Sequence, residues 1–338
     1  MSSEYRDDLE ARLAHAQELA WQGRGREAEE VLAAIDTDGL PERELMAVAL
    51  PRAANQFWML SEPERATAFL RNVGNRVTEP VGRATLDALS ATFAMNAGNP
   101  LRALEIATEV LASADADAQA TAWSASTASL CSARTGRFDQ VEEFAARAVA
   151  AEHPGLLRYT IGLARITALA ITGRIDEATD VALGCAVATQ PSGSIGDVLL
   201  AWVLMAQDRH SEAAELLIPA APTLDRTGYS WGPLVLMLLA TALARRGDLA
   251  DAAKALSRAD SRHGTKSALF APELGVARAW RLAATGDQHG AISAVRQAAQ
   301  MAERSGQSAV AVQVWRDAVR LGDSRADGPL QRLTAELA

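Results

Sequence analysis

The segment Gly173-Arg-Ile-Asp-Glu-Ala178 contains the pattern that decides the fold, a turn residue followed five positions later by a small residue. The pattern occurs eight times, as Gly23/Ala28, Ser61/Ala66, Gly98/Ala103, Gly136/Val141, Gly173/Ala178, Asp208/Ala213, Gly247/Ala252 and Gly286/Ala291. Successive turn residues are 35 to 39 positions apart. A nearly constant period of this length is typical of an array of helical hairpins, each of which packs only on its neighbours.

Each unit is expected to contain two helices joined by this turn. Small residues precede the turn by seven positions and larger ones by four, a spacing that places both on one helical face. Glycine suits the end of the first helix because a left-handed C-cap costs it no steric penalty. Pro41, Pro154 and Pro191 each lie 18 residues past a turn residue and are expected to start the next helix.

The sequence therefore predicts an all-α, superhelical solenoid of about eight hairpins. The expected first helices of the units are 4–22, 42–60, 81–97, 116–135, 155–172, 192–207, 229–246 and 267–285. A further hairpin, near 307–320 and 327–337, is expected to cap the C-terminal end, because an exposed solenoid end needs a polar cover. Residues 1–338 are interpreted as a single domain with repeats of about 37–39 residues. Ala220–Ser230 is the least regular stretch and is predicted to form a loop with a local kink.

Charge and composition exclude several classes of function. The net charge of −9 leaves no basic face for phosphates, so no direct nucleic-acid partner is expected. The N-terminus has no apolar signal segment and no apolar run is long enough to span a bilayer, so we expect a cytoplasmic protein without a membrane partner. Two cysteines and five histidines in different units give no metal-ligand spacing. No nucleophile or dinucleotide motif is present, so we expect no enzyme activity, catalytic residue, metal or cofactor.

The turn pattern Gly-x-x-x-Glu-Ala is similar to the middle of a tetratricopeptide repeat. The longer period and the Ala- and Arg-rich composition resemble the sensor region of MalT-type regulators, which are large ATP-binding LuxR-family transcription activators common in actinobacteria. The resemblance is closest from Ala277 to Asp323, which contains Trp280, Gly286-Asp287, Arg304-Ser-Gly306 and Val319-Arg-Leu-Gly322-Asp323. It implies a right-handed superhelix, and a role in ligand sensing, signal transduction and regulation of transcription.

This sequence departs from the family in two respects. It has no Gly-x-x-x-x-Gly-Lys-Ser/Thr phosphate loop, and it stops at Ala338 without a helix-turn-helix. ATP hydrolysis and DNA binding are therefore not expected of this chain. Either it is an excised sensor domain, whose partners would include the ATPase and DNA-binding modules of a parent regulator, or it is a stand-alone relative.

The resemblance also implies that the first helix of each unit lines a concave groove. Positions 13, 10, 6, 3 and 2 before each turn residue then face that groove. The candidate ligand-binding residues at such positions are Asn55, Trp58, Thr92, Asn96, Trp123, Thr167, Trp202, Thr241 and Trp280. This mixture of indoles, hydroxyls and amides favours an aromatic-lined pocket over a core position. For any single tryptophan, packing between hairpins is an equally good interpretation.

The expected ligand is a small, uncharged or mildly polar molecule, because few basic residues face the groove. Arg134 and Arg245 are the chief cations among the groove positions, so a sugar-like effector fits better than an acidic peptide. The alternative is a tetratricopeptide-type protein–protein adaptor that holds a partner segment in its concave groove or on its convex face.

Overall fold

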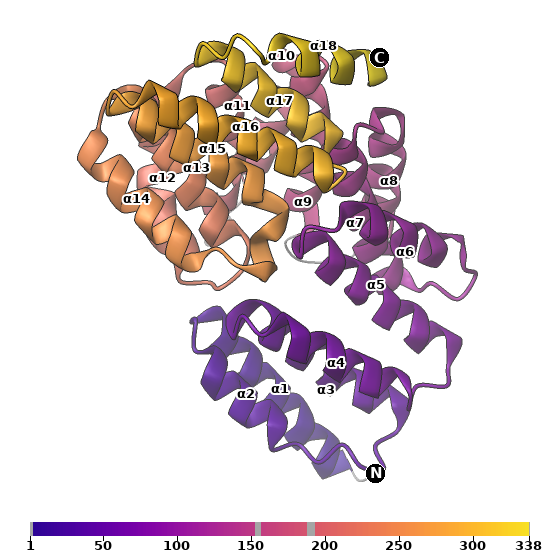
Figure 1. Cartoon of the computed structure of the whole chain (residues 1–338). Coiled ribbons are helices and arrows are strands. Elements are labelled where there is room, and N and C mark those ends of the chain that lie inside the picture. The colour runs from indigo at the N-terminus through magenta and orange to yellow at the C-terminus, as the bar shows by residue number, and fades with distance from the viewer. Residues whose placement is uncertain (1–2, 153–156, 188–192, 338) are drawn as a thin grey trace.

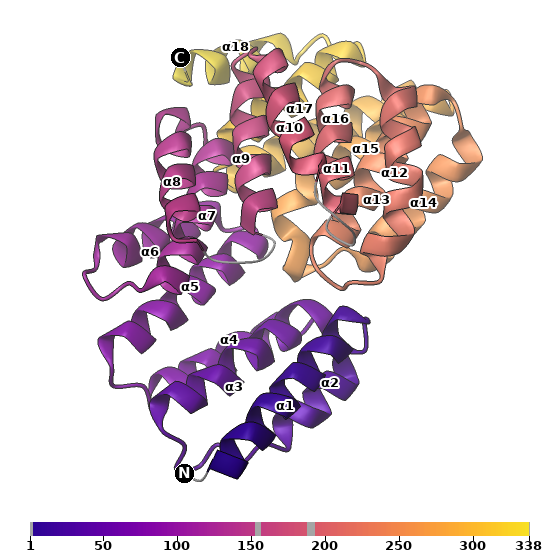
Figure 2. The ribbon, with the colours of Figure 1, turned by 180° about the vertical axis from the view of Figure 1, so that it is seen from behind.

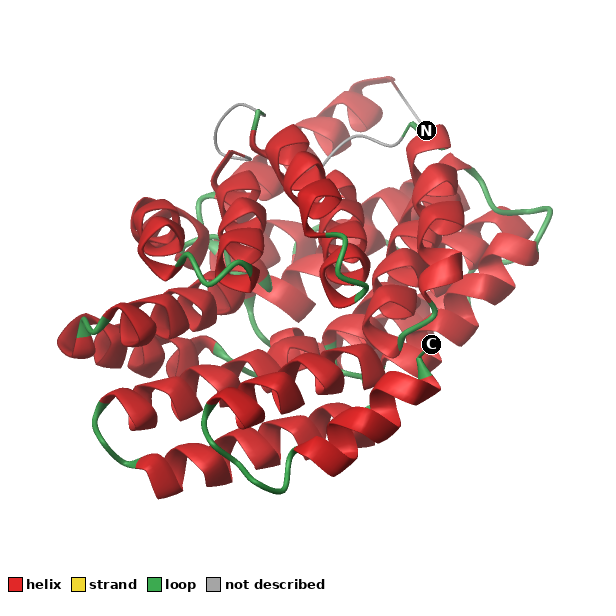
Figure 3. Ribbon diagram, turned by 90° about the horizontal axis from the view of Figure 1, so that it is seen from above, coloured by secondary structure: helices red, strands yellow, loops and turns green. Residues whose placement is uncertain are grey.

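The computed structural model describes residues 3–152, 157–187 and 193–337 and contains only helices, turns and loops in these ranges (Figure 1, Figure 3). The hairpins are α1 (Ser3–Trp21) with α2 (Gly25–Ala33), α3 (Glu42–Ala54) with α4 (Pro63–Gly74), α5 (Pro80–Asn96) with α6 (Pro100–Ala112), α7 (Ala118–Thr135) with α8 (Phe138–Ala150), α9 (Leu157–Ile171) with α10 (Ile175–Ala186), α11 (Gly193–Ala206) with α12 (His210–Asp225), α13 (Trp231–Arg246) with α14 (Leu249–Arg262), and α15 (Ala271–Ala284) with α16 (Gln288–Arg304). A ninth hairpin, α17 (Ser308–Arg320) with α18 (Asp327–Glu336), covers the C-terminal end. None of the described helices is both long and apolar enough to cross a bilayer.

The backbone confirms the repeat pattern. All eight predicted turn residues have positive φ, from 57° at Ser61 to 97° at Gly247. Glycine tolerates this left-handed conformation and aspartate visits it more readily than most residues, which explains Asp208 in the sixth unit. The small residue five positions later is at most 3% exposed in every unit. The all-α solenoid predicted from the sequence is therefore confirmed.

The second unit departs from the predicted continuous helix 42–60. A short π-helix, η1 (Asn55–Met59), follows α3, and the Leu60 amide donates to the Asn55 carbonyl at 3.0 Å. A π-helical turn accommodates one extra residue. The buried small residue in this unit is consequently Ala53, fully inaccessible to solvent, and not Ala54.

The prediction of a loop at Ala220–Ser230 is wrong for the first half of this segment. Helix α12 continues to Asp225 although Pro219 and Pro222 lie inside it. The Asp225 carboxylate accepts from Arg262 Nε at 2.8 Å, which ties the end of α12 to α14. Of the predicted helix starts, Pro41 directly precedes α3. Pro154 and Pro191 lie outside the described residues.

The N-terminal and C-terminal parts of the superhelix, here its two arms, meet across the concave side. Figures 1 and 2 both show α1–α4 facing the loop ends of α12–α14. The Trp58 ring lies 5.7 Å from that of Tyr229, and Asn96 Oδ1 accepts from Ser230 Oγ at 2.6 Å. A Cβ on Gly23 would lie only 2.5 Å from the Arg226 carbonyl oxygen, so this approach requires glycine. We call this contact between the arms the seam.

Two buried cations hold the seam. Lys266, in the 3₁₀-helix η2 (Thr265–Phe270), donates to the carbonyls of Trp58 and Gly228, each at 2.8 Å. Burial lowers the pKa of Lys266 to about 8. The hydrogen bond to Trp58 joins residues 208 positions apart in the sequence, so Lys266 closes the superhelix and does not merely support one hairpin.

Arg134 is the second seam cation and has no solvent-exposed surface. Its Nε donates to Gln307 Oε1 at 2.6 Å, and its Nη2 donates to the Leu269 carbonyl at 2.8 Å and lies 2.9 Å from Glu273 Oε1. The guanidinium also lies over the Phe270 ring, 5.1 Å from its centroid. The concave groove expected from the sequence is therefore filled at its middle and divided into separate pockets.

Candidate functional site: two pockets on the inner face

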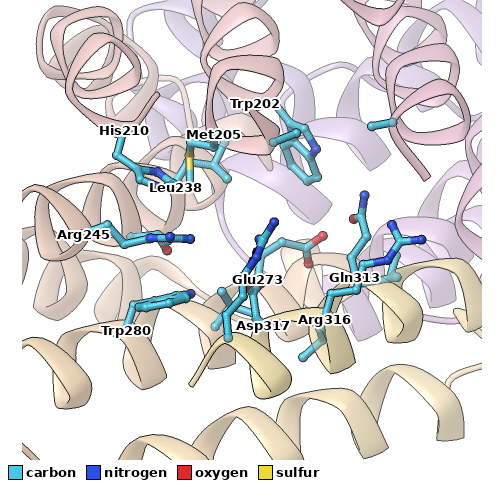
Figure 4. A pocket seen from close by; sticks show the side chains of 17 residues that line it. Trp202, Met205, His210, Leu238, Arg245, Glu273, Trp280, Gln313, Arg316 and Asp317 are labelled. Carbon is cyan, nitrogen blue, oxygen red and sulfur yellow. Dashed lines mark hydrogen bonds and ion pairs between the residues drawn. The ribbon is translucent and has the colours of Figure 1, made fainter. Parts of the chain in front are cut away.

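The first pocket lies between α11, α13, α15 and α17, and we call it the C-terminal pocket. It has a volume of about 180 Å³. Its lining includes Trp202, Met205, His210, Leu238, Arg245, Glu273, Trp280, Gln313, Arg316 and Asp317 (Figure 4). Because α11, α13 and α15 are the first helices of consecutive hairpins, their inner faces come together here, and the cap helix α17 supplies the remaining wall.

Two indole rings define the aromatic part of the C-terminal pocket. Trp280 is half-buried, and the Arg245 guanidinium lies over its ring, 4.0 Å from the centroid (Figure 4). This cation–π contact fixes both side chains. Trp202 is only 8% exposed and also belongs to the core between α11 and its neighbours. Truncation of Trp202 would therefore disturb packing and pocket together, and Trp280 is the cleaner probe of binding.

Most charged side chains of the C-terminal pocket are paired. Arg245 lies 3.3 Å from Asp208, and Arg320 lies 3.8 Å from Asp208 and 3.5 Å from Asp317. Burial raises the pKa of Asp317, against the opposing effect of Arg320 and Arg245. Glu273 is paired with Arg134 of the seam. The pocket is therefore polar, but most of its charged side chains are neutralised by a partner of opposite charge.

Two basic side chains of this pocket lack a hydrogen-bond partner. Arg316 has no ion pair or hydrogen bond with any described residue, and burial, followed by repulsion from Arg320, lowers its pKa. Neither ring nitrogen of His210 has a hydrogen bond within the described part of the chain, although Nε2 lies 3.4 Å from Asp208 Oδ1. Burial, with the positive charge of Arg245, lowers the pKa of His210, which favours the neutral ring.

The second pocket, here the N-terminal pocket, lies on the other side of the seam and has a volume of about 320 Å³. Its lining is uncharged and consists of Ala16, Gln17, Ala20, Trp21, Leu32, Leu50, Pro51, Ala54, Asn55, Met59, Gln119, Trp123 and Tyr229. The rings of Trp21 and Tyr229 are 5.8 Å apart, and burial raises the pKa of Tyr229. Asn55 donates to the Gly25 carbonyl at 2.9 Å, while its buried Oδ1 has no hydrogen bond among the described residues.

The nine predicted site residues divide among three environments. Trp202, Thr241 and Trp280 line the C-terminal pocket, and Asn55 and Trp123 line the N-terminal pocket.

The other four predicted residues line neither pocket. Trp58 packs edge-on against Phe93 at the seam, where Asn96 bonds with Ser230. The Thr92 hydroxyl lies 3.1 Å from that of Thr127. Thr167 is fully buried, with no hydrogen bond to its hydroxyl among the described residues.

Sequence reasoning missed the contribution of α17, which it treated only as a cap. The sequence nevertheless contains a signal for it, because Gly322 lies 36 positions after Gly286 (322 − 286). The structure confirms Gly322 as a ninth turn residue, with φ of 79°. Six positions before Gly322 is Arg316, at the register position that holds Trp202 and Trp280 in earlier units. Five positions after Gly322 the sequence has Asp327 instead of a small residue, so the repeat pattern is not recognisable in this unit.

Comparison with known proteins supports the fold. The chain matches no protein-family model and no curated protein sequence. It is similar to a Rap protein solved in complex with competence and sporulation factor, with a TM-score of 0.66 and 11% identity over 98% of both chains. It is also similar to the APC/C hetero-tetramer Cut9–Hcn1, with a TM-score of 0.54 and 16% identity over 91% of this chain and 58% of that one. The apo form of RapI gives a TM-score of 0.50 and 11% identity over 97% of each chain.

These likenesses define the class of the molecule. At such low identity they show the fold alone, and the fold is an all-α, right-handed helical-repeat solenoid of the tetratricopeptide type.

Proposed function

We propose that this chain is a non-catalytic binding solenoid that holds a peptide segment of a protein partner in the C-terminal pocket. The observation that carries the proposal is the pocket itself, in which the Trp280 ring and the unpaired Arg316 face one inner cavity. An aromatic face supplies contact area and a few polar groups fix orientation, as recognition sites require. The Rap protein to which the chain is similar along its length was solved with a bound factor, which favours the same kind of use.

The charges of this pocket change the expected ligand. An uncharged effector was expected because few cations occupy the groove positions of the eight units. Helix α17 brings Arg316, Asp317 and Arg320 to the C-terminal pocket, so this pocket contains more charged side chains than the groove positions predicted. A peptide with both apolar and charged side chains complements this lining better than a sugar.

Replacing Trp280 by alanine should weaken binding of peptides selected by the wild-type protein from a random hexapeptide library. We expect the dissociation constant to rise about tenfold or more, because a ring that stacks on the ligand is worth on the order of 1–3 kcal/mol. Since Trp280 is only half-buried, the melting temperature should fall less than it would for truncation of the buried Trp202. Isothermal titration calorimetry and thermal melts measure the two effects.

The matched control is Trp21→Ala, which removes an exposed indole from the N-terminal pocket and should leave peptide affinity unchanged. Failure to select any peptide, or equal affinity for wild type and Trp280→Ala, would contradict the peptide-binding proposal.

A second candidate is effector sensing in a MalT/LuxR-type regulator, and the N-terminal pocket favours it. Its uncharged lining of three aromatic rings and several amides suits a small neutral ligand such as a sugar. A panel of neutral mono- and oligosaccharides, tested by calorimetry, should then bind the wild type and Trp280→Ala equally and bind Trp21→Ala at least about fivefold more weakly. No binding by any sugar, or loss of binding in Trp280→Ala alone, would exclude this role for the pocket.

A further inference from the structure

Arg316 has no electrostatic compensation inside the C-terminal pocket. The pocket contains two acidic side chains, and each is already engaged: Glu273 pairs with Arg134 at 2.9 Å and Asp317 with Arg320 at 3.5 Å. Asp208, outside the lining, lies within 4 Å of both Arg245 and Arg320. Arg316 therefore remains a half-buried guanidinium with no ion pair among the described residues, and the like charge of Arg320 acts on it.

This situation is unfavourable in the empty protein. A guanidinium loses hydration when it is partly buried, and a carboxylate placed in its plane returns that energy through two parallel hydrogen bonds. Gln313 lies one helical turn before Arg316 on α17, and both side chains rise toward the side of the pocket that Trp202 lines (Figure 4). The side-chain amide of Gln313 has no hydrogen bond among the described residues, and its NH₂ group supplies a further donor next to the guanidinium.

The size of the pocket limits what can reach Arg316. A cavity of about 180 Å³ is smaller than the 300–1,000 Å³ typical of pockets that enclose a whole small ligand. It has room for one long side chain, while the backbone of a peptide stays outside. A side chain with an aliphatic stem and a terminal carboxylate matches the lining, because Trp202, Val276 and Val314 cover the stem and Arg316 receives the charge.

We infer that the C-terminal pocket accepts a glutamate or aspartate side chain of a peptide partner, and that Arg316 is the residue that selects it. This inference rests on the proposed function and specifies the chemistry of its ligand. It makes Arg316 the specificity-determining residue of the site, with Gln313 as a second donor.

The test uses the full chain and two hexapeptide libraries with amidated C-termini, one complete and one without Asp and Glu. Selection on the wild type should enrich peptides with an acidic residue from the complete library and should yield nothing of comparable affinity from the acid-free one. For an enriched peptide, Arg316→Gln should raise the dissociation constant at least about tenfold, and Arg316→Lys should restore part of the affinity because it keeps the charge but loses the planar donors.

Two controls separate this effect from folding and from general charge. Arg304→Gln removes an exposed arginine of α16 outside the pocket and should change affinity less than about twofold. Arg316→Glu should reject the acidic peptide and bind the same peptide with Lys in place of its acid, which a misfolded variant cannot do.

This inference would be overturned if the selected peptides bound equally well with and without their acidic residue, and equally well to the wild type and to Arg316→Gln. The peptide-binding function itself would not be contradicted by that result. Enrichment only with libraries that carry a free C-terminus would instead assign the pocket to a terminal carboxylate and overturn the side-chain assignment. Absence of any enriched peptide would overturn the proposed function and, with it, the inference.

Discussion

Replacement of Arg134 by methionine should lower the free energy of unfolding by about 3–5 kcal/mol, because it removes one partner of a buried charge pair. The side chain has no exposed surface, and its loss leaves Glu273, Gln307 and the Leu269 carbonyl without their shared donor. Buried acceptors without a donor keep their full desolvation penalty. The two arms should separate at the seam, since the residues that Arg134 joins are far apart in the sequence.

Urea unfolding followed by circular dichroism measures this effect, and small-angle X-ray scattering should show a larger radius of gyration. Arg137→Met, at an exposed position just after the same turn, is the matched control and should change stability by less than about 0.5 kcal/mol. Equal stability and unchanged dimensions for Arg134→Met would show that the seam does not hold the arms together.

Replacement of Ala240 by aspartate should destabilise the chain by several kcal/mol. Ala240 lies in α13 with no exposed surface, at the helix crossing predicted from the position seven residues before Gly247. A carboxylate placed there would be buried without a partner, which is among the most costly kinds of substitution.

Thermal melts by circular dichroism measure the loss. Ala253→Asp, on the exposed face of α14, carries the same change in helix propensity and should leave the melting temperature within a few degrees of the wild type. A melting curve for Ala240→Asp that matches that of Ala253→Asp would mean that the repeat register is wrong.

The fold was predictable because its information is local. A hairpin needs a left-handed turn and small residues where its helices cross, and both recur at a fixed spacing along the chain. Gly136 and Val141 illustrate this, since the first has φ of 89° and the second is buried against the preceding helix. The π-helix η1 was not predictable, because one extra residue within a turn leaves the apolar pattern almost unchanged.

The seam lay beyond sequence reasoning for a different reason. Asn96 meets Ser230 and Arg134 meets Gln307 only because the superhelix curves back on itself, and that curvature adds up from small rotations between hairpins. The register correctly placed Trp202, Thr241 and Trp280 on one surface. It could not show that Trp58 and Asn96 are used to close the arms.

The closed seam also gives the two pockets their separate character. The N-terminal pocket is lined only by uncharged side chains, whereas the C-terminal pocket contains the charged side chains of α13, α15 and α17. One solenoid can therefore offer two sites of different chemistry on its inner face, and variants such as Trp21→Ala and Trp280→Ala address them one at a time.

The most direct test of peptide binding at the C-terminal pocket is a crystal structure of the full chain with an enriched acidic hexapeptide. We predict that the peptide lies along α13, α15 and α17, with its acidic side chain inside the pocket and a carboxylate oxygen within about 3 Å of the Arg316 guanidinium. A peptide bound on the convex face or across the N-terminal pocket, with Arg316 still unpaired, would contradict this account.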